Sequence, residues 1–391
     1  MGALAVNIAV VTSLYPTPAK PFEGVFAERR WTAMAAAGHS VRVIYPLPMA
    51  PLPIGRFAAI AKTPAHQRRG PIAVDHPRYL HLPRNARGNA QRFAKVALRM
   101  LRAEPWPDVV VCDYAWPASA LAPLLRAHAP KVPCIINGRG SDVLQVAGEA
   151  GLGQELAENL RASAGWSGVS LDLVHTMDRL AADGRQGTLI ANGVDSDLFQ
   201  PGDRAAARAA VHVEGSAPLV LVVGHLIPRK DPLLALQAFL EGAPADAQLA
   251  FIGRGPLEDE LRARVGELGA GSRVAFLGER GPGELREWYR AANLLLLTSS
   301  REGRPNVVLE ALSSGLPVVA TDAGGTSELL PGGCACVSER SASAIAAAIR
   351  QVLSQPPTAE SLRRSVEPLS WQASRQALEQ LLASAVSNTH A

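Results

Sequence analysis

The chain has 391 residues, which at roughly 100–200 residues per domain predicts two domains, each large enough to bury its own core. Hydrophobic residues make up 48% and charged residues 19%, so disordered, collagen-like and disulfide-stapled peptide classes are excluded. The formal net charge of +4 is uneven, because residues 56–104 hold eleven basic and two acidic residues, a net +9 that favours an anionic partner.

Short β-branched runs alternate along the chain with alanine-rich helical stretches, a pattern typical of parallel sheets built from βαβ units. In the first half we expect strands at 6–12, 41–45, 109–112 and 134–136, and helices at 26–37, 89–102 and 118–128. In the second half we expect strands at 219–223, 248–252, 273–277, 294–297 and 318–321, and helices at 231–240, 257–268, 284–291, 307–314, 344–353 and 371–386.

The helix expected at 89–102 has one apolar and one basic face. Such a helix can lie in a membrane interface, and it can equally be a core-packed surface helix with a solvated basic face; both interpretations stay open. Nucleic acid is not expected as its partner, since the basic segment has few aromatic side chains to stack on bases. The apolar face would carry Phe93, Val96, Ala97, Met100 and Leu101, and the cations are Arg92, Lys95, Arg99 and Arg102.

The fold class predicted is α/β, with two doubly wound domains facing a central cleft. Turn residues cluster at 192–203, where apolar periodicity lapses, and this places the joint between the domains. We therefore expect a first domain over 1–195, a second over 196–368, and a final helix in 369–391 that crosses back onto the first. Ligands of open α/β sheets bind at the carboxyl ends of the strands, so the strand-to-helix turns are the places to look for function.

The composition also bears on location. Four cysteines lack the spacing of zinc ligands and are too few for a disulfide framework, and we interpret them as reduced thiols. No apolar run approaches the roughly 20 residues that span a bilayer, and residues 3–14 predict a strand rather than a signal peptide. We expect a cytoplasmic protein, with a peripheral position on the inner face of the membrane if the basic helix binds there.

Three strand-to-helix turns in the second half carry polar chemistry. After 219–223 come Gly224, Arg229 and Lys230 and then a helix, a combination suited to an anion, although the same cations could be solvated loop residues. After 248–252 comes a glycine turn, 253–256, that lacks the third glycine of a dinucleotide fingerprint and the lysine of a Walker motif.

The third turn, 298–312, is the most informative. Glu302 and Gly303 lie in the loop and Glu310 about one turn into the following helix, so the two carboxylates can flank one extended ligand. The backbone N–H groups of 303–307 would face a diphosphate above the sheet.

These turns resemble the motifs of the retaining glycosyltransferases of family 4, which have the GT-B fold, and in particular their bacterial polysaccharide-biosynthesis members. The third turn is similar to the E-x7-E motif, and the first to the G-(R/H)-L-x3-K turn. Further similar stretches extend through most of the chain. They are 21–26, the R-G-S-D at 139–142, the N-G-V-D at 192–195, 253–256, 316–321 with Gly324, Gly325 and Glu328, and the helix from Trp371.

The resemblance implies a role for each matching position. Glu310 would bind ribose hydroxyls, Glu302 would bind hydroxyls of the donor sugar, and Lys230 would neutralise the diphosphate leaving group. Glu302 and Lys230, with Asp113, form the implied catalytic set, and no metal or other cofactor is implied. The implied donor-binding residues are Gly24, His225, Arg229, Lys230, Gly253, Glu302, Gly303, Arg304, Pro305, Asn306 and Glu310, and the acceptor-side candidates are Arg139, Ser141 and Asp142.

Two positions depart from the family pattern. His225 stands where many members have Arg, and a neutral imidazole carries less of the phosphate charge. Asp113 stands where members commonly have a His near the reacting sugar carbon. A carboxylate there can orient the acceptor hydroxyl or stabilise an oxocarbenium-like centre, or it can be a helix cap in a protein that has lost catalysis.

The resemblance implies a hexosyltransferase-type enzyme that moves a sugar, with retention, from a nucleoside diphosphate sugar of UDP or GDP type to a lipid-linked or growing bacterial glycan. The alternatives are a nucleotide-sugar epimerase or a phosphorylase of the same fold, and a non-catalytic nucleotide- or glycan-binding subunit of a polysaccharide assembly complex. A nicotinamide dehydrogenase is the outside possibility. The sugar, the base, the linkage and the oligomeric state are not encoded in these motifs.

Overall fold

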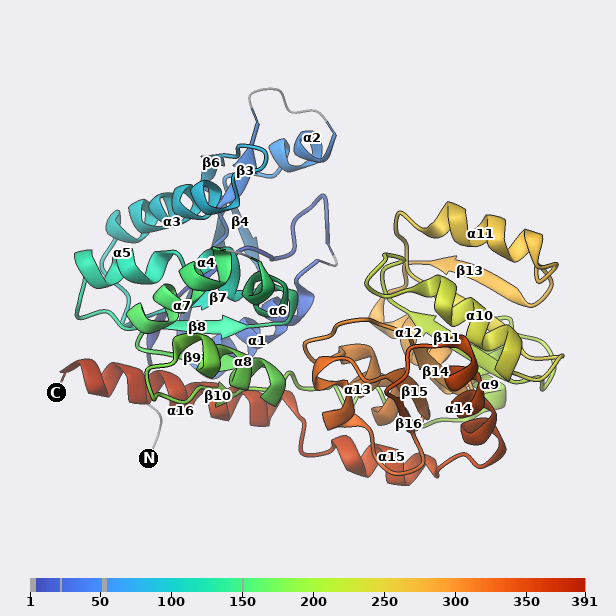
Figure 1. The fold of residues 1–391 in the computed structure, drawn as a ribbon. Helices are drawn as coiled ribbons and strands as arrows, with labels where there is room; N and C mark the ends of the chain where they lie inside the picture. The colour runs from blue at the N-terminus through green and yellow to red at the C-terminus, as the bar shows by residue number, and fades with distance from the viewer. Residues whose placement is uncertain (1–4, 22, 51–54, 150, 391) are drawn as a thin grey trace. The chain divides into compact units, whose positions relative to one another are not determined.

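A computed structural model describes residues 5–21, 23–50, 55–149 and 151–390 and divides the chain into two compact units (Figure 1). Unit 1 contains residues 1–192 and 371–391, and unit 2 contains residues 193–370. Both units are α/β structures with helices on both faces of a largely parallel sheet, as the alternating sequence pattern predicts.

Unit 1 is built on an eight-stranded sheet in the order β10-β9-β8-β7-β1-β2-β5-β4. All neighbouring strands are parallel except the edge pair β4 and β5, which is antiparallel. The strands are β1 (Asn7–Thr12), β2 (Ser40–Ile44), β4 (His66–Arg69), β5 (Ile72–Asp75), β7 (Val109–Asp113), β8 (Cys134–Gly138), β9 (Gly165–Gly168) and β10 (Thr188–Leu189).

Alternate side chains of the central strand β7 point into two different cores, one on each face of the sheet. Val110 and Cys112 face the layer that holds α3, α5, α7 and α8, while Val109 and Val111 face α1 and α16. The helices of unit 1 are α1 (Val25–Ala36), α2 (Arg56–Ala61), α3 (Ala86–Arg102), α4 (Ala115–Ala118), α5 (Leu121–His128), α6 (Ser141–Gly148), α7 (Leu152–Ala162), α8 (Leu171–Ala181) and α16 (Trp371–His390).

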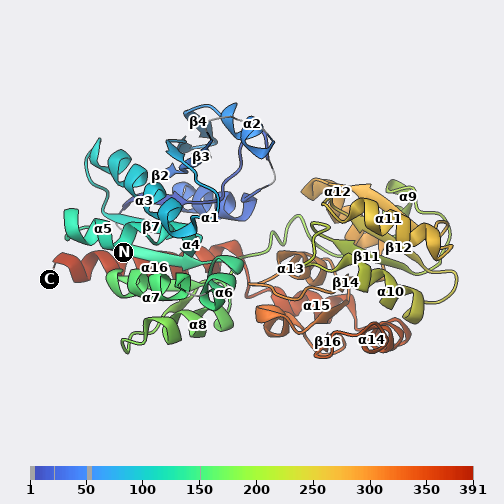
Figure 2. The same ribbon diagram turned by 45° about the horizontal axis from the view of Figure 1, so that its top comes forward.

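The C-terminal helix α16 returns to unit 1, as the sequence predicts. Its Leu378 and Leu382 are buried in one core with Trp31 and Met34 of α1, so they complete the second face of the sheet. Figure 2 shows α16 running along unit 1 beside its other helices.

Unit 2 has a six-stranded, all-parallel sheet in the order β13-β12-β11-β14-β15-β16. Its strands are β11 (Leu219–Val223), β12 (Gln248–Ile252), β13 (Val274–Gly278), β14 (Leu294–Leu297), β15 (Val318–Thr321) and β16 (Ala335–Val337). Its helices are α9 (Arg204–Ala210), α10 (Pro232–Gly242), α11 (Glu258–Glu267), α12 (Pro282–Ala291), α13 (Asn306–Ser313), the 3-10 helix η1 (Gly324–Leu329), α14 (Ala342–Ser354) and α15 (Ala359–Val366).

Strands β11, β12, β14 and β15 agree closely with the sequence prediction, because each is a continuous apolar run that is almost wholly buried. Strand β13 lies near the expected 273–277 although it is only partly buried, and the short, partly exposed β16 is not predicted. The prediction is incomplete for 46–88, where β3 (Leu47–Met49), α2, β4, β5 and β6 (Arg78–Leu80) precede the basic helix. It is also incomplete for 137–192, where α6, α7, α8, β9 and β10 lie. Many of these missed elements are short or partly polar, so they lack the apolar periodicity on which the prediction rests.

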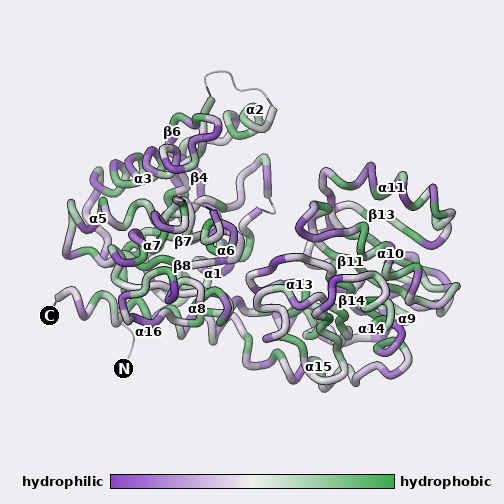
Figure 3. The backbone as a smooth tube through the Cα atoms, viewed as in Figure 1, coloured by the Kyte–Doolittle hydropathy of each residue, from purple (hydrophilic) through white to green (hydrophobic). Residues whose placement is uncertain are grey.

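The basic helix forms as α3, and its apolar face belongs to the core. Phe93, Ala97 and Leu101 are fully or almost fully buried against α5, β7 and their neighbours. Figure 3 shows hydrophilic and hydrophobic positions alternating along this helix. The expectation that this apolar face inserts into a membrane is therefore wrong for these residues, and the alternative of a core-packed helix with a basic outer face is confirmed.

Candidate active site

Three strand-to-helix turns of unit 2 meet at one edge of its sheet. Strand β11 lies between β12 and β14, and parallel strands present their carboxyl ends on the same side. The turns that follow these strands begin at Gly224, Gly253 and Thr298, which are the three turns that the sequence singles out.

The two glycine turns interlock through their backbones. Gly253 has φ 142°, and a Cβ atom built on it would lie 2.0 Å from the carbonyl oxygen of Gly224, so no other residue fits. A Cβ on Gly255 would lie 2.3 Å from the carbonyl oxygen of Leu226. These glycines therefore let the loop that carries Arg229 and Lys230 pack directly on the neighbouring turn.

Lys230 and Glu302 form an ion pair between the first and third turns. Arg229 Nη1 lies 3.3 Å from Glu302 Oε2 and donates to the carbonyl oxygen of Arg301 at 2.9 Å. Burial alone would raise the pKa of Glu302, but the charges of Lys230 and Arg229 and the hydrogen bond from Lys230 outweigh it and lower this pKa. The site thus holds an ionised, largely buried carboxylate between two cations.

Hydrogen bonds to backbone carbonyl oxygens fix these two loops to each other. Thr298 Oγ1 lies 3.0 Å from the carbonyl oxygen of Lys230 and 2.9 Å from that of Asp231. The backbone N–H of Ser300 donates to the carbonyl oxygen of Arg229 at 2.8 Å. Asp231 in turn caps α10 by accepting from the N–H of Leu234 at 3.3 Å, so the cation loop is held at both ends.

The third turn continues through Gly303, Arg304 and Pro305 into α13, which begins at Asn306, one residue before the expected start. The carbonyl oxygen of Gly303 accepts from the N–H of Gly325 at 3.1 Å. Arg304 is buried and lies 3.3 Å from Glu328, and burial lowers its pKa. Arg304 therefore ties this turn to η1.

Glu310 lies one turn into α13 and is buried. Its Oε2 accepts from the hydroxyl of Tyr289, on α12, at 3.0 Å. Burial, together with the negative charge of Glu310, raises the pKa of Tyr289 well above its usual value, so the phenol stays protonated and donates. Tyr289 therefore orients one oxygen of Glu310.

Two further predicted donor residues are His225 and Gly24. His225 has an exposed side chain in the loop after β11. Gly24 belongs to unit 1, where it has φ 77° at the start of α1, and a Cβ there would lie 2.8 Å from Tyr15 Cα. Phe22, in the same loop, lies outside the described residues.

In unit 1 Asp113 ends β7 with no exposed surface. Its carboxylate accepts from Trp31 Nε1 at 2.8 Å, from Asn137 Nδ2 at 2.6 Å, and from Arg139 Nε and Nη2 at 2.8 and 2.9 Å. Burial alone would raise the pKa of Asp113, but Arg139 outweighs this effect and lowers it to about 2. Its catalytic role stays a prediction, and the contacts found here are those of a residue that orients Arg139.

A second buried arginine, Arg30 of α1, was not foreseen. Arg30 Nη2 donates to the carbonyl oxygen of Ile190 at 2.9 Å and to Asn192 Oδ1 at 3.1 Å, while Arg139 Nη1 donates to the same Asn192 oxygen at 2.9 Å. Burial, followed by the charge of Arg139, lowers the pKa of Arg30 to about 9. The sequence does offer one sign of this buried arginine. Arg30 lies on the same face of α1 as the buried residues Ala27 and Trp31, where an apolar residue is expected.

The R-G-S-D stretch forms the start of α6. Ser141 is the exposed first residue of the helix, and Asp142 accepts from the backbone N–H of Arg139 at 3.0 Å and from that of Ala115 at 2.6 Å. Burial raises the pKa of Asp142 to about 6, against the opposing effect of these N–H groups. The structure thus brings Asp113, Arg139 and Asp142 together in unit 1.

Across residues 5–21, 23–50, 55–149 and 151–390, no group of three or more His, Cys, Asp or Glu side chains is arranged to hold a metal ion. Within the same ranges, no helix combines the length and the apolar character needed to cross a membrane.

The part of the chain that carries the three turns of unit 2 matches a known protein family. Residues 203–367 match the family described as Glycosyl transferases group 1. The chain is 27% identical over 335 residues to a putative teichuronic acid biosynthesis glycosyltransferase, TuaC, of Bacillus subtilis, a match that covers 83% of this chain and 82% of the relative.

A second relative matches over a shorter stretch. The lipopolysaccharide core biosynthesis mannosyltransferase LpsB of Rhizobium meliloti is 33% identical over 195 residues, which cover 44% of this chain and 52% of the relative. The chain therefore aligns with about half the length of LpsB.

The fold is shared with a solved sucrose-phosphate synthase from Thermosynechococcus elongatus. That structure superposes with a TM-score of 0.79 at 21% identity and covers 98% of this chain and 100% of the solved one. The predicted fold class is thereby confirmed, as is the expectation of a hexosyltransferase-type enzyme. The chain has the GT-B fold and is a glycosyltransferase, whose second unit carries the match to the glycosyl transferases group 1 family.

Proposed function

We propose that the protein is a retaining glycosyltransferase of family 4 that transfers a sugar from a nucleoside diphosphate sugar, of UDP or GDP type, to a hydroxyl of a lipid-linked or growing bacterial glycan. The observation that carries the proposal is the cluster of Arg229, Lys230 and Glu302 at the carboxyl edge of the unit 2 sheet. It combines cations suited to a diphosphate with an ionised carboxylate suited to sugar hydroxyls.

Lys230 serves both parts of the donor. An ammonium group has three N–H donors, so Lys230 can hold Glu302 and still donate to a phosphate oxygen. As the bond between the sugar and the diphosphate breaks, negative charge grows on the phosphate, and Lys230 and Arg229 stabilise it where it forms. We propose that these two cations stabilise the leaving group without a metal ion.

Glu302 and Glu310 have different tasks. Glu302, ionised between two cations, accepts hydrogen bonds from donor-sugar hydroxyls, and its mostly buried position restricts how the sugar can lie. Glu310, oriented by Tyr289, accepts from the ribose hydroxyls of the nucleotide. The turn of Gly303, Arg304, Pro305 and Asn306 offers backbone N–H groups at the start of α13 to the sugar and the diphosphate.

The acceptor side is assigned to unit 1, with Arg139, Ser141 and Asp142 at the start of α6 and Asp113 holding Arg139 in place. The relatives support a bacterial glycan as acceptor, since TuaC is described as a teichuronic acid enzyme and LpsB as a lipopolysaccharide core enzyme. The proposed location is cytoplasmic, at the inner face of the membrane.

The test is a transfer assay with a panel of UDP- and GDP-hexoses and a bacterial lipid extract as acceptor, in which release of the nucleoside diphosphate is measured. We expect one donor to be consumed only when acceptor is present, with the same rate after addition of EDTA, and the product to keep the anomeric configuration of the donor. The variant Lys230→Ala should lower the rate by at least a hundredfold, while Glu267→Gln, an exposed acid at the end of α11, should leave it unchanged.

The alternatives predict other outcomes. An epimerase converts the donor without acceptor, and a non-catalytic binding protein holds the nucleotide without any turnover. An inverted product, or a rate that EDTA abolishes, contradicts the proposed mechanism.

A further inference from the structure

Asp231, the residue that follows Lys230, has an unusual backbone conformation. Its φ of 50° and ψ of 62° lie in the left-handed region, which residues other than glycine rarely adopt because the Cβ atom crowds the backbone. Such a conformation persists where the surrounding contacts hold it in place. Because Asp231 is joined directly to Lys230, the contacts that hold its backbone also hold Lys230 in the loop.

The carboxylate of Asp231 has two partners. Its Oδ1 accepts from the backbone N–H of Leu234 at 3.3 Å and caps α10, and its Oδ2 lies 2.8 Å from Arg340 Nη2. A glycine would adopt the same conformation without strain, but it would offer neither contact. The two contacts therefore hold the side chain of Asp231 and, through it, the left-handed backbone.

Arg340 lies in the loop between β16 and α14, and the packing of unit 2 fixes this loop. Ser341, the next residue, caps α14 by accepting from the N–H of Ala344 at 3.2 Å. Helix α14 lies close against α10, since a Cβ atom built on Gly242 would lie 2.6 Å from Ala346 Cα. Two closely packed helices thus bring Arg340 and the start of α10 together.

The same nitrogen of Arg340 also contacts the third turn. Arg340 Nη2 lies 3.3 Å from the carbonyl oxygen of Thr298, whose hydroxyl donates to the carbonyl oxygens of Lys230 and Asp231. The guanidinium thereby joins the turn that carries Lys230 to the turn that carries Glu302. Within the described part of the chain, Arg340 forms no ion pair with Glu302, so it acts on the loops that hold the donor-binding side chains.

Charge gives Arg340 a second task. The carboxylate of Asp231 belongs to the residue next to Lys230, so without a partner it would repel a diphosphate bound there. Arg340 offsets this negative charge. Both side chains are 34% exposed, so solvent screens the pair in part and a moderate effect on binding is expected.

We propose that Arg340 is a positioning residue of the donor site. It holds the left-handed Asp231 and neutralises its carboxylate, so that Lys230 meets the diphosphate of the donor. The inference rests on the proposed function, because it takes Lys230 as the group that binds the diphosphate. It assigns Arg340 itself no contact with the donor.

The experiment is a double-mutant cycle on the full-length protein, followed by calorimetric titration with UDP, GDP and inorganic pyrophosphate. Arg340→Ala should weaken binding of the tightest of these probes about fivefold or more, whereas Arg340→Lys, which keeps the charge, should stay within about threefold of wild type. Asp231→Gly should also stay within about threefold, because glycine adopts the left-handed conformation without support and brings no carboxylate. The double variant should then match Asp231→Gly within about twofold.

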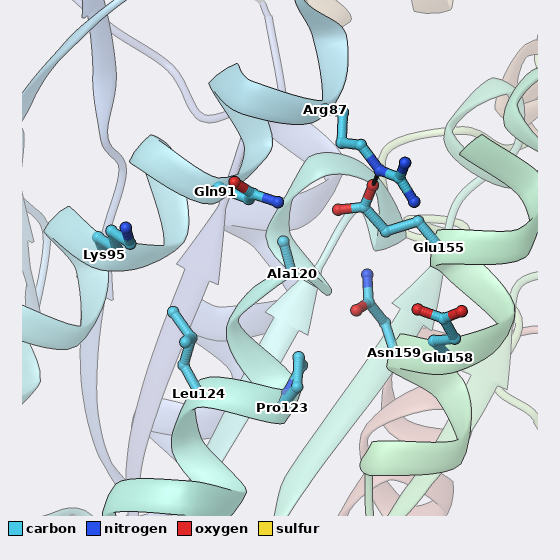
Figure 4. A pocket seen from close by; sticks show the side chains of 9 residues that line it. All are labelled: Arg87, Gln91, Lys95, Ala120, Pro123, Leu124, Glu155, Glu158 and Asn159. Atoms are coloured by element: carbon cyan, nitrogen blue, oxygen red, sulfur yellow. Dashed lines mark hydrogen bonds and ion pairs between the residues drawn. The ribbon is translucent and has the colours of Figure 1, made fainter. Parts of the chain in front are cut away.

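Two control variants remove arginines that do not hold the donor turns. Arg350→Ala breaks a contact between α14 and α10, in which Arg350 Nη1 donates to the carbonyl oxygen of Glu241 at 2.8 Å. Arg87→Ala breaks an ion pair of unit 1, in which Arg87 Nε lies 2.6 Å from Glu155 Oε2 beside a cavity of about 380 Å³ (Figure 4). Both controls should bind the probes like wild type.

The contrary results differ in what they reject. Unchanged binding by Arg340→Ala, or an equal loss in Arg350→Ala, overturns the positioning role while the donor site stands. An equal loss from Arg340→Ala in the wild-type and Asp231→Gly backgrounds means that Arg340 binds the diphosphate directly, which also overturns it. The expected coupling in a protein that transfers no sugar supports the positioning role and rejects the proposed function instead. A wild type that binds none of the probes contradicts both.

Discussion

At the scale of single residues, the chemistry of the donor side depends on how one carboxylate is kept ionised. Glu302 is mostly buried, and its charge is supported by Lys230 and Arg229 from the neighbouring turn. Glu310, eight residues later, accepts a hydrogen bond from the neutral phenol of Tyr289. Two carboxylates with such different surroundings are expected to respond differently to substitution.

Glu302→Gln should lower the rate of sugar transfer by two or more orders of magnitude with a less than threefold change in nucleotide affinity, because the amide cannot replace a charged acceptor for the sugar. Glu310→Ala should instead weaken nucleotide binding about tenfold or more, since hydrogen bonds to a charged group contribute roughly 1.5–3 kcal/mol. Transfer kinetics and calorimetric titration with the nucleoside diphosphate separate the two effects. Identical profiles for both variants would refute the division of roles.

Because of Asp142, the stability of the folded protein should depend on pH. Burial raises its pKa to about 6 in the folded protein, above the unfolded value near 3.8, so the folded state binds a proton that the unfolded state releases. Stability from this group is therefore present at low pH and is lost as pH rises from about 4 through 6.

The measurement is urea unfolding of the wild type and of Asp142→Asn between pH 4.5 and 7. Relative to the variant, the free energy of unfolding of the wild type should rise by about 1–2 kcal/mol as pH falls over this range. A difference that does not change with pH would show that Asp142 titrates normally.

At the scale of elements, α3 shows what a pattern of sequence can and cannot decide. Its apolar and basic faces are evident from spacing alone, but a core and a membrane interface demand the same amphipathic pattern. Phe93 is buried among β7, α5 and their neighbours, so the apolar face of α3 belongs to the core.

Phe93→Ala should therefore destabilise unit 1 by about 3–5 kcal/mol, because it removes a ring from a closely packed core. Gln91→Ala, at an exposed position of the same helix, should change stability by less than about 0.5 kcal/mol. Chemical denaturation followed by circular dichroism measures both. A small effect of Phe93→Ala would mean that this face is not part of the core.

The glycine turns are a second case at this scale. Their spacing resembles a dinucleotide fingerprint, and the sequence shows only that the fingerprint is incomplete. The close approach of Gly253 to the carbonyl of Gly224 explains why glycine is needed there: the contact is between two backbones. Contacts between turns that are about thirty residues apart are not encoded in local spacing.

For the whole molecule, the sequence predicts two α/β units and a helix that returns to the first, because long buried strands and strongly periodic helices dominate both halves. It also places Arg229, Lys230 and Glu302 in turns at the carboxyl ends of strands, and Glu310 one turn into the helix that follows. It does not predict the buried network of Arg30, Asp113, Arg139 and Asn192, since this network joins residues up to 162 positions apart through side-chain geometry.

The central claim is that unit 2 binds a nucleoside diphosphate through Lys230. The most direct measurement is the melting temperature of the full-length protein with UDP, GDP, ADP, CMP and NAD, repeated with Lys230→Ala and with the exposed Lys131→Ala as control. One nucleoside diphosphate should stabilise the wild type and the control, by about 2.7 kcal/mol at a hundred times its Kd, and should leave Lys230→Ala unchanged. Stabilisation by none of the nucleoside diphosphates, or an undiminished response of Lys230→Ala, would contradict this account.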